Sequence, residues 1–416
     1  MKSTDKFKTS IVALLQKLPL LALAMSMVAC QQAVQSENPT DEQHPIAVAE
    51  GVQVAAERTQ AWLPLLKDKR VGLVVNHTAT IGSTHLVDSM LGLGLNITAI
   101  FGPEHGFRGT AADGETVDDS KDLKTGIPVY SLYRGDKKPT REQLAEIDVL
   151  VFDIQDVGVR FYTFISTMHK CMEACADAGV PFIVFDRPNP HGNSVDGPVL
   201  EMEHQSFVGM HPIPLLHGLT VAELARMIQG EGWLGEEREL DLTVVTMKGW
   251  SHADYYELPI APSPNLPNQL SIMLYPSLGL FEGSSASIGR GTDHPFQLIG
   301  HPDFGLGSFA FKPESRQESK YPKHEGKQCF GTSLINLNPE EVHSAGLNLS
   351  WLVGWHEDLS RMAEFYRGDG YFEKLAGTRS LRKQLADGWT QEQIRESWQE
   401  ELQEYRLMRE SYLLYD

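Results

Sequence analysis

The sequence predicts an α/β protein in which a parallel sheet with helices on both faces is followed by a smaller α+β domain. Short apolar runs alternate with segments of helical length through the first half of the chain. Several of these runs are apolar at almost every position, as expected for strands that are covered on both faces. After about residue 250 the chain becomes rich in Pro, Gly and Ser, and from residue 339 onwards it is helical and charged. Strands separated by helices in this way predict a Rossmann-like sheet in the N-terminal domain.

The elements of the predicted sheet follow from these runs in chain order. Thr220 and Glu223 form the capping-box pattern that begins a helix, and Gly179 is a typical helix stop. We predict strands at 71–75, 97–101, 149–152, 182–185 and 242–245, and helices at 84–92, 163–179 and 220–230.

The first 29 residues have the pattern of a leader. Four lysines are followed by an apolar stretch at 18–29 that runs into the sequence MVAC at 27–30, and this stretch is too short to span a bilayer as a stable helix. MVAC resembles the bacterial lipoprotein box, which predicts a lipid anchor at Cys30; an ordinary secretory signal cleaved near Ala29 is the alternative. Either way we expect the mature protein to leave the cytoplasm and face the periplasm. Gln31 after the cysteine favours the outer membrane.

A polar tether and two domains are expected after the leader. Residues 30–47 contain almost nothing to bury, which is typical of a tether. About 370 residues remain, a length that suits two cores better than one. We place the Rossmann-like domain at 48–254 and the C-terminal α+β domain at 255–416.

The charge of the chain limits its partners. The leader carries four lysines and one aspartate, so the formal charge changes from −19 to about −22 when the leader is removed. Nucleic-acid binding needs a cationic surface, so no nucleic-acid partner is expected. Membrane contact is expected through the lipid anchor only.

The remaining cysteines do not indicate a disulfide framework or a nucleophile. Cys171 and Cys175 lie four residues apart in a predicted helix, where disulfide geometry is poor and the spacing matches no zinc motif. The favoured interpretation is buried thiols, and a long-range bridge to Cys329 is the alternative.

Acidic segments follow three of the predicted strands. Ligands of an open parallel sheet bind outside the carboxyl ends of its strands. The second strand runs into GPEHGFRG at 102–109, the central strand into DIQDVG at 153–158 and RFYT at 160–163, and the next strand into DRPNP at 186–190. One such acid more often caps a helix or stabilises a loop than it binds a ligand. Three such segments in one sheet favour a ligand site.

A glycine- and serine-rich loop at 282–293 adds a glutamate and an arginine that suit an anionic or hydroxylated ligand. The loop lacks the Gly-Lys-Ser/Thr ending of a P-loop, and no dinucleotide fingerprint follows the first strand, so nucleotide binding is disfavoured. A His-Glu-x-x-His motif and a Gly-x-Ser-x-Gly elbow are also missing from the sequence. His105, His294 and His301 are candidate metal ligands without ligand spacing, so we expect neither a metal nor another cofactor.

These segments resemble one family, the NamZ-type exo-β-N-acetylmuramidases. The resemblance covers nearly the whole chain after about residue 52, with two slight departures at Gly102 and His294. It is carried, in chain order, by FGPEHGFRG at 101–109, DIQDVG at 153–158, RFYT at 160–163, DRPNP at 186–190, SFVG at 206–209, PSPN at 262–265 and GRGT at 289–292.

The resemblance implies both an architecture and an activity. The expected architecture is a Rossmann-like N-terminal domain and a smaller C-terminal domain, with the active site in the cleft between them. The expected activity is the release of N-acetylmuramic acid from non-reducing ends of peptidoglycan fragments, without a metal. Peptidoglycan-derived saccharides are therefore the expected partners, in cell-wall turnover or recycling.

Glycoside hydrolysis gives the candidate residues their roles. One carboxyl group protonates the leaving oxygen, and a second usually acts as nucleophile or base. We hypothesise that Glu104 is the general acid, because its proline and phenylalanine neighbours suit a raised pKa, and that His105 tunes it. Glu282 is favoured as the second carboxylate, with Asp153 and Asp156 as alternatives.

A further set of residues is predicted to bind the sugar. Arg160 and Arg290 are candidates for holding the lactyl carboxylate that distinguishes muramic acid from glucosamine, since arginine recognises carboxylates well. Tyr162 is expected to stack on the sugar, and Asn265 to donate or accept a hydrogen bond. The predicted substrate-binding set also includes Arg108, Asp186 and Arg187.

Two other functions stay open at this point. A glycan-binding lipoprotein without catalysis would keep Arg160, Tyr162 and Arg290 but would not need Glu104. The intact Pro-Glu-His-Gly segment favours the enzyme. A metal-dependent hydrolase of another envelope substrate would differ in its sensitivity to chelators.

Overall fold

The structure is a computed structural model, and it describes residues 51–103, 107, 119–132, 135–235, 237–305 and 307–416. The predicted leader, tether and lipid anchor at Cys30 lie outside the described residues, as do Glu104, His105 and Arg108. Within the described residues, no helix has the length and apolar character that a membrane span requires.

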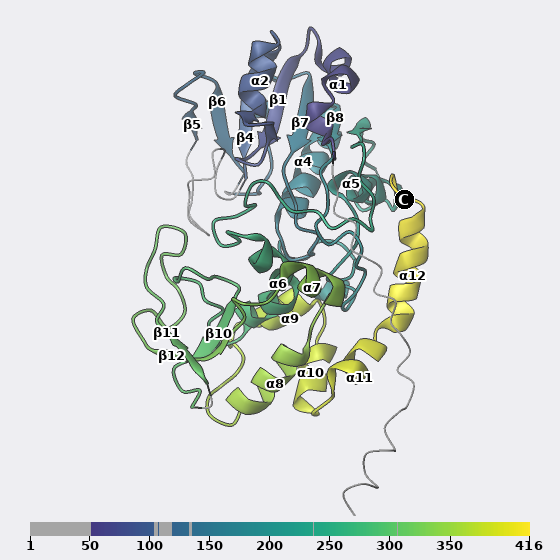
Figure 1. Ribbon diagram of the computed structural model, residues 1–416. Coiled ribbons are helices and arrows are strands. Elements are labelled where there is room, and N and C mark those ends of the chain that lie inside the picture. The colour runs from purple at the N-terminus through teal and green to yellow at the C-terminus, as the bar shows by residue number, and fades with distance from the viewer. Residues whose placement is uncertain (1–50, 104–106, 108–118, 133–134, 236, 306) are drawn as a thin grey trace, which may run out of the picture. The chain divides into compact units, whose positions relative to one another are not determined.

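A mainly parallel sheet forms the centre of the N-terminal region (Figure 1). In the described part of the chain its order is β5-β6-β4-β1-β7-β8-β9, and each neighbouring pair is parallel except β5 with β6. Without β5 this is the Rossmann order 3-2-1-4-5-6, so the predicted fold class is confirmed. The strands are β1 (Arg70–Val75), β4 (Asn96–Gly102), β5 (Ser120–Lys121), β6 (Pro128–Ser131), β7 (Val149–Asp153), β8 (Phe182–Phe185) and β9 (Leu242–Val245).

Helices cover both faces of this sheet, which explains the uniformly apolar strands. On β7, Val149 and Val151 pack into one core with α1 and α2, whereas Leu150 and Phe152 pack into the other with α3, α4 and α5. The helices are α1 (Thr59–Leu66), α2 (Leu86–Gly92), α3 (Arg141–Leu144), α4 (Phe164–Ala178) and α5 (Val221–Gly230).

The predicted helix at 84–92 begins two residues later than expected. Thr84 and His85 form β3 (Thr84–His85), which pairs with β2 (Thr80–Ile81) in a small hairpin. The side chain of His85 then accepts a hydrogen bond from the backbone of Val87 and caps α2. At α5, the predicted capping box of Thr220 and Glu223 is confirmed.

The C-terminal region combines an antiparallel sheet with helices, as predicted. Among the described residues its sheet has the order β10-β12-β11. The core on the α4 and α5 face of the large sheet continues into this region through Leu274, Phe281 and Phe296. The elements are α6 (Gln269–Leu278), β10 (Leu298–His301), β11 (Phe309–Phe311), β12 (Cys329–Ser333), α7 (Pro339–Ala345), α8 (Ser350–Leu359), α9 (Tyr371–Ala376), α10 (Ser380–Ala386), α11 (Gln391–Glu396) and α12 (Gln399–Glu410).

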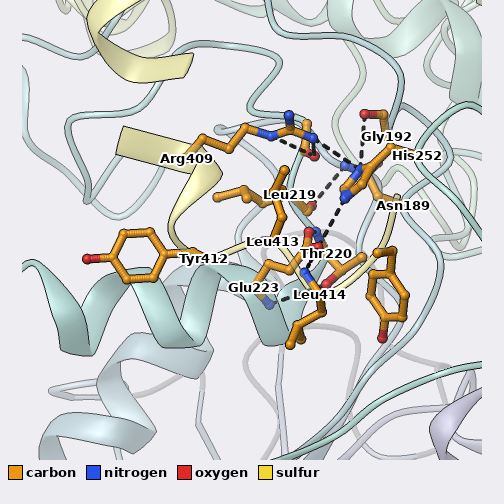
Figure 2. Close-up of polar contacts among 12 residues, drawn as sticks. Asn189, Gly192, Leu219, Thr220, Glu223, His252, Arg409, Tyr412, Leu413 and Leu414 are labelled. Carbon is orange, nitrogen blue, oxygen red and sulfur yellow. Dashed lines mark hydrogen bonds and ion pairs between the residues drawn. The ribbon is translucent and has the colours of Figure 1, made fainter. Parts of the chain in front are cut away.

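The last residues of the chain return to the N-terminal region. Helix α12 leads toward α5, beside which the C-terminus lies (Figure 1). Oε1 of Glu223 accepts hydrogen bonds from Nε2 of His252 at 3.0 Å and from the backbone nitrogen of Leu414 at 2.8 Å (Figure 2). The hydroxyl of Tyr415 donates to Oδ2 of Asp186 at 2.5 Å. The C-terminal segment is therefore part of the structure that holds α5.

The three cysteines in the described part of the chain are buried thiols, as predicted. Cys171, Cys175 and Cys329 are free. Burial raises the pKa of all three thiols, to about 11 for Cys329, so each stays in its un-ionised and poorly nucleophilic form at neutral pH.

Candidate active site

The carboxyl ends of β7 and β8 are joined by a buried ion pair. Nε of Arg187 donates to Oδ1 of Asp153 at 2.5 Å, and Nη2 donates to Oδ2 at 2.8 Å. Both side chains are buried. This bidentate geometry satisfies both carboxylate oxygens of Asp153 within the protein. The pair fixes the ends of the two strands relative to each other.

Asp156 is a buried carboxyl group with one unsatisfied oxygen. Its Oδ2 accepts a hydrogen bond from the backbone nitrogen of Gly158 at 2.7 Å, but Oδ1 has no hydrogen-bond partner among the described residues. Burial raises the pKa of Asp156 to about 7. A carboxyl group with a pKa near neutrality is suited to proton transfer, and such groups concentrate at functional sites. Asp156 therefore fits the role of an acid better than that of a fixed anion.

Gly158 is required by the turn that carries Asp156. Its φ of +74° lies in the left-handed region, and an added Cβ would lie 2.0 Å from Oδ1 of Asn189. Asn189 itself donates to the backbone oxygen of Leu219 at 2.9 Å. The turn after β7 is thus packed tightly against the segment after β8.

Asp186 is bonded on both oxygens by the protein itself. Its Oδ1 accepts from the backbone nitrogens of Arg187 and Ala222, and its Oδ2 accepts from the hydroxyls of Thr220 and Tyr415. Burial is the main cause that raises its pKa to about 7. These contacts make Asp186 the anchor for the start of α5 and for the C-terminal segment.

Arg160 lies fully inside the protein. Its Nη1 donates to the backbone oxygens of Pro198 and Ile213, and its Nη2 donates to those of Leu375 and Ala376, all at 2.7–3.0 Å. Burial lowers its pKa to about 9. The guanidinium therefore links the loop after β7 to the end of α9, and its terminal nitrogens are directed at the chain itself.

The loop at 261–265 lies between the large sheet and the C-terminal region. Nε2 of His77, after β1, lies 2.8 Å from the backbone oxygen of Ala261. The hydroxyl of Tyr162 donates to the backbone oxygen of Pro262 at 2.9 Å. The side-chain amide of Asn265 donates to the backbone oxygen of Glu318, also at 2.9 Å. Tyr162 and Asn265 are both buried.

Glu282 and Arg290 form a partly exposed ion pair. Nε of Arg290 donates to Oε1 of Glu282 at 2.6 Å, and the two side chains are 23% exposed for Glu282 and 20% for Arg290. Among the described charged residues of the predicted site, these two alone exceed one-tenth exposure. They are thus the charged groups that a ligand from solvent can reach.

A chain of aromatic rings connects this pair to the N-terminal region. The guanidinium of Arg290 lies over the ring of Phe296 at 5.0 Å. Phe296 packs edge-on against Tyr275 at 4.9 Å, and Tyr275 packs edge-on against Tyr162 at 5.9 Å. The structure therefore brings Tyr162, Glu282 and Arg290 into one cluster, although more than a hundred residues separate Tyr162 from the other two in the sequence.

Comparison with known proteins identifies the family of the chain. The family model for the N-terminal domain of exo-β-N-acetylmuramidase NamZ matches residues 71–270, and the model for the C-terminal domain matches residues 273–415. The chain belongs to the NamZ family. The resemblance predicted from the sequence motifs is thereby confirmed.

Individual relatives agree with this family assignment. The peptidoglycan β-N-acetylmuramidase NamZ of Bacillus subtilis (strain 168) is 42% identical over 371 residues, which cover 84% of this chain and 88% of the relative. A crystal structure of a DUF1343 family protein from Bacteroides fragilis NCTC 9343 matches with a TM-score of 0.82 and 42% identity, covering 88% of this chain and 99% of that one. A second from the same organism has a TM-score of 0.74 and 30% identity, with the same coverage.

In this NamZ family member, Lys323 holds the loop that carries Glu282. Its ammonium group donates to the backbone oxygens of four residues at 2.7–3.2 Å: Phe281, Glu282, Ser284 and Ala286. Burial lowers the pKa of Lys323 to about 8. Lys323 is not among the residues predicted from the sequence, because a single lysine in a Pro-rich segment matches no motif.

Two residues around the same loop have left-handed backbone conformations. Phe296 has a φ of +56° and His324 has a φ of +59°. Such conformations cost non-glycine residues about 1–3 kcal/mol and concentrate at functional sites. Nε2 of His324 also lies 2.7 Å from the backbone oxygen of Ser285. No sequence signal predicts these conformations, because phenylalanine normally avoids them and histidine adopts them only in a minority of cases.

Proposed function

We propose that this chain is an exo-acting β-N-acetylmuramidase that releases N-acetylmuramic acid from non-reducing ends of peptidoglycan fragments. The observation that carries this proposal is the match to both NamZ domains, together with the high identity to a peptidoglycan β-N-acetylmuramidase. The partly exposed Glu282–Arg290 pair supplies a carboxylate of the kind that glycoside hydrolysis requires.

The proposed mechanism uses Glu104 as the general acid and Glu282 as the second carboxylate. Glu104 protonates the glycosidic oxygen as the bond to the sugar breaks. Glu282 stabilises the positive charge that develops on the sugar ring, or it attacks the ring, either directly or by activating a water molecule. Its hydrogen bond from Arg290 and the contacts of Lys323 with its loop keep the carboxylate in one orientation. Asp156, with its pKa near 7, is the alternative proton-transfer group.

Recognition of muramic acid is assigned to Arg290. Arg290 reaches solvent, whereas Arg160 is buried and donates to backbone oxygens, so Arg290 is the better placed of the two to hold a lactyl carboxylate. The rings of Phe296, Tyr275 and Tyr162 form a chain beside it, and because Phe296 and Tyr162 are buried, these rings support Arg290 from within the protein.

We also propose that the protein acts in the cell envelope, in cell-wall turnover or recycling, held by a lipid on Cys30. The leader and the MVAC segment support this location. Expression of the full chain should give a membrane-bound protein whose N-terminal peptide carries a diacylglyceryl modification by mass spectrometry. A Cys30→Ala variant that stayed in the membrane fraction would rule out the anchor.

Replacement of the proposed acid tests the enzymatic mechanism. Glu104→Gln should lower turnover of a β-N-acetylmuramide by two or more orders of magnitude, since the amide cannot donate the proton that the leaving oxygen needs. Its far-UV circular dichroism and urea midpoint should match those of the wild type. Near-normal turnover in Glu104→Gln would remove this residue from the mechanism.

A further inference from the structure

Two glutamates and a histidine lie together in a short turn that the mechanism does not use. Glu203 and His204 belong to the 3-10 helix η2 (Met202–His204), and Glu201 directly precedes this helix. Ligand atoms of Glu201, Glu203 and His204 all lie within 4.8 Å of one another. Nε2 of His204 is 3.3 Å from Oε1 of Glu203 and 3.8 Å from Oε2 of Glu201.

His204 distinguishes this group from an ordinary cluster of surface acids. Its side chain is 8% exposed, whereas those of Glu201 and Glu203 are 44% and 62% exposed. Its Nε2 is buried and has no hydrogen-bond partner in the described part of the chain. An unpartnered buried nitrogen is costly and calls for a ligand or another explanation. Here that nitrogen faces two carboxylates.

A further carboxylate lies across a cavity that Glu203 and His204 help to line. Glu373 of α9 borders a cavity of about 460 Å³ together with Glu203 and His204. Its Oε1 accepts from Arg382 at 2.7 Å, whereas its Oε2 is buried and has no hydrogen-bond partner among the described residues. Two buried polar atoms from distant segments of the chain, one on His204 and one on Glu373, therefore lack a hydrogen-bond partner among the described residues.

We propose that this cavity is a binding site for a divalent ion of the zinc class, with His204, Glu203 and Glu201 as ligands and Glu373 beside them. Zinc takes nitrogen and carboxylate ligands at about 2.0–2.2 Å in tetrahedral geometry, which places ligand atoms about 3.3–3.6 Å apart. The separation of 3.3 Å between His204 and Glu203 fits this geometry without movement. A small rotation of the Glu201 carboxylate about its hydrogen bond from Thr378 can shorten the 3.8 Å separation between its Oε2 and His204.

The ligand set favours zinc over magnesium. An imidazole nitrogen suits zinc and other late first-row ions, whereas magnesium prefers oxygen ligands in octahedral geometry and keeps several waters. The positive groups beside the site are Lys374 and Arg379, which line the cavity, and Arg382, which pairs with Glu373; Arg379 lies 3.9 Å from Glu203. Arg379 is exposed, so its side chain is free to turn into solvent when the ion binds.

The site has a structural role, because it joins the turn at 201–204 to α9 and the residues that follow it. The two segments already share a bond from the backbone nitrogen of Glu201 to the oxygen of Gly377, and another from the hydroxyl of Thr378 to Oε1 of Glu201. The metal adds a link across the same contact. Its binding should stabilise the folded chain by mass action and leave the catalytic residues untouched.

Zinc titration of the full chain tests the site. Protein prepared with a chelator and then dialysed should bind one zinc ion with an affinity that Glu203→Gln and His204→Ala each weaken at least tenfold, by isothermal titration calorimetry. Zinc should also raise the melting temperature of the wild type by several degrees. Millimolar MgCl₂ should neither bind measurably nor raise the melting temperature. Turnover of a muramide should be the same with zinc and with chelator.

Glu357→Gln provides the matched control. Glu357 is 64% exposed and ion-paired to Arg361, much as Glu203 is exposed beside Arg379, but it lies outside the cluster. Zinc affinity should be unchanged in this variant. A wild type that binds no zinc would overturn the proposal, as would zinc binding that neither Glu203→Gln nor His204→Ala weakens. If the ring of His204 is instead held between the carboxylates as an imidazolium, the wild type will bind no zinc. Since no ligand belongs to the candidate active site, these outcomes are independent of the proposed activity.

Discussion

Arg290 contacts Glu282 through its Nε atom at 2.6 Å while its guanidinium lies over the ring of Phe296 at 5.0 Å. The arginine is therefore held between an acid and an aromatic ring, and it holds the acid in return. Because Phe296 has a left-handed backbone, the ring position depends on a conformation that costs free energy. A partly exposed charge pair is thus supported from below by a buried ring with a strained backbone.

The Glu282→Gln variant should lose turnover by at least a hundredfold with little change in KM. Glutamine has nearly the same shape and can still accept the hydrogen bond from Arg290, but it carries no negative charge for the transition state. Glu314→Gln, at an exposed glutamate paired with Lys312, is the matched control and should behave as the wild type. Steady-state kinetics on a β-N-acetylmuramide measure both. If Glu282→Gln kept wild-type turnover, Glu282 would not be the second carboxylate.

Arg290→Ala should impair muramyl substrates more than glucosaminyl ones. Removing the guanidinium takes away the partner of the lactyl carboxylate, which glucosamine lacks, as well as the hydrogen bond to Glu282. The second loss affects both substrates alike, so the ratio of their kcat/KM values isolates the first. We expect this ratio to fall at least tenfold. Equal losses on both substrates would refute a role in reading the carboxylate.

Asp156→Asn should stabilise the protein above neutral pH. Burial raises the folded-state pKa of Asp156 to about 7, well above the ordinary value of about 3.9 for an aspartate, so the folded state binds more protons than the unfolded state between these pH values. Wild-type stability therefore falls as the pH rises through this window. Asparagine does not titrate, so the free energy of unfolding of Asp156→Asn should exceed that of the wild type by up to about 4 kcal/mol at pH 8 and by little at pH 4. Urea midpoints at the two pH values measure the difference.

Asp186→Asn is the control for this prediction. Asp186 has the same raised pKa of about 7, but donors occupy both of its oxygens. An amide nitrogen would face some of these donors, so the variant should be less stable than the wild type at both pH values. A stabilised Asp186→Asn, or a destabilised Asp156→Asn at pH 8, would contradict this account of the two aspartates.

Arg160→Met should cost stability and leave specificity unchanged. The substitution leaves four buried backbone oxygens without their donor, which should cost about 3–5 kcal/mol. The protein that still folds should keep the wild-type preference for muramyl over glucosaminyl substrates. A stable variant with a lost preference would instead give Arg160 the substrate-binding role predicted from its motif.

The sequence predicts the sheet well because burial on both faces leaves a simple signal. All of the strands predicted from uniformly apolar runs are present. Strand β6, which lies between β4 and the edge strand β5, was not predicted, because Pro128–Ser131 is short and only partly buried. The start of α2 was misplaced by two residues, since the pairing of β2 with β3 is a contact that helical periodicity does not reveal.

The site is predicted less completely, because a motif does not show whether its charges face solvent or the protein. Asp153 and Arg187 come from separate motifs yet neutralise each other. Arg160 is directed at oxygens more than two hundred residues further along the chain. Such partners depend on the tertiary fold. The same holds for Lys323, whose contacts with four backbone oxygens exist only after the loop at 281–286 has formed.

The most direct test is hydrolysis of a chromogenic β-N-acetylmuramide and of the matching β-N-acetylglucosaminide by the purified wild type. The two substrates differ only in the lactyl ether, so the ratio of kcat/KM values reports recognition of that group. We expect hydrolysis of the muramide, release of free N-acetylmuramic acid and at least a hundredfold preference over the glucosaminide. No hydrolysis of the muramide, or equal rates on the two sugars, would contradict the proposed function.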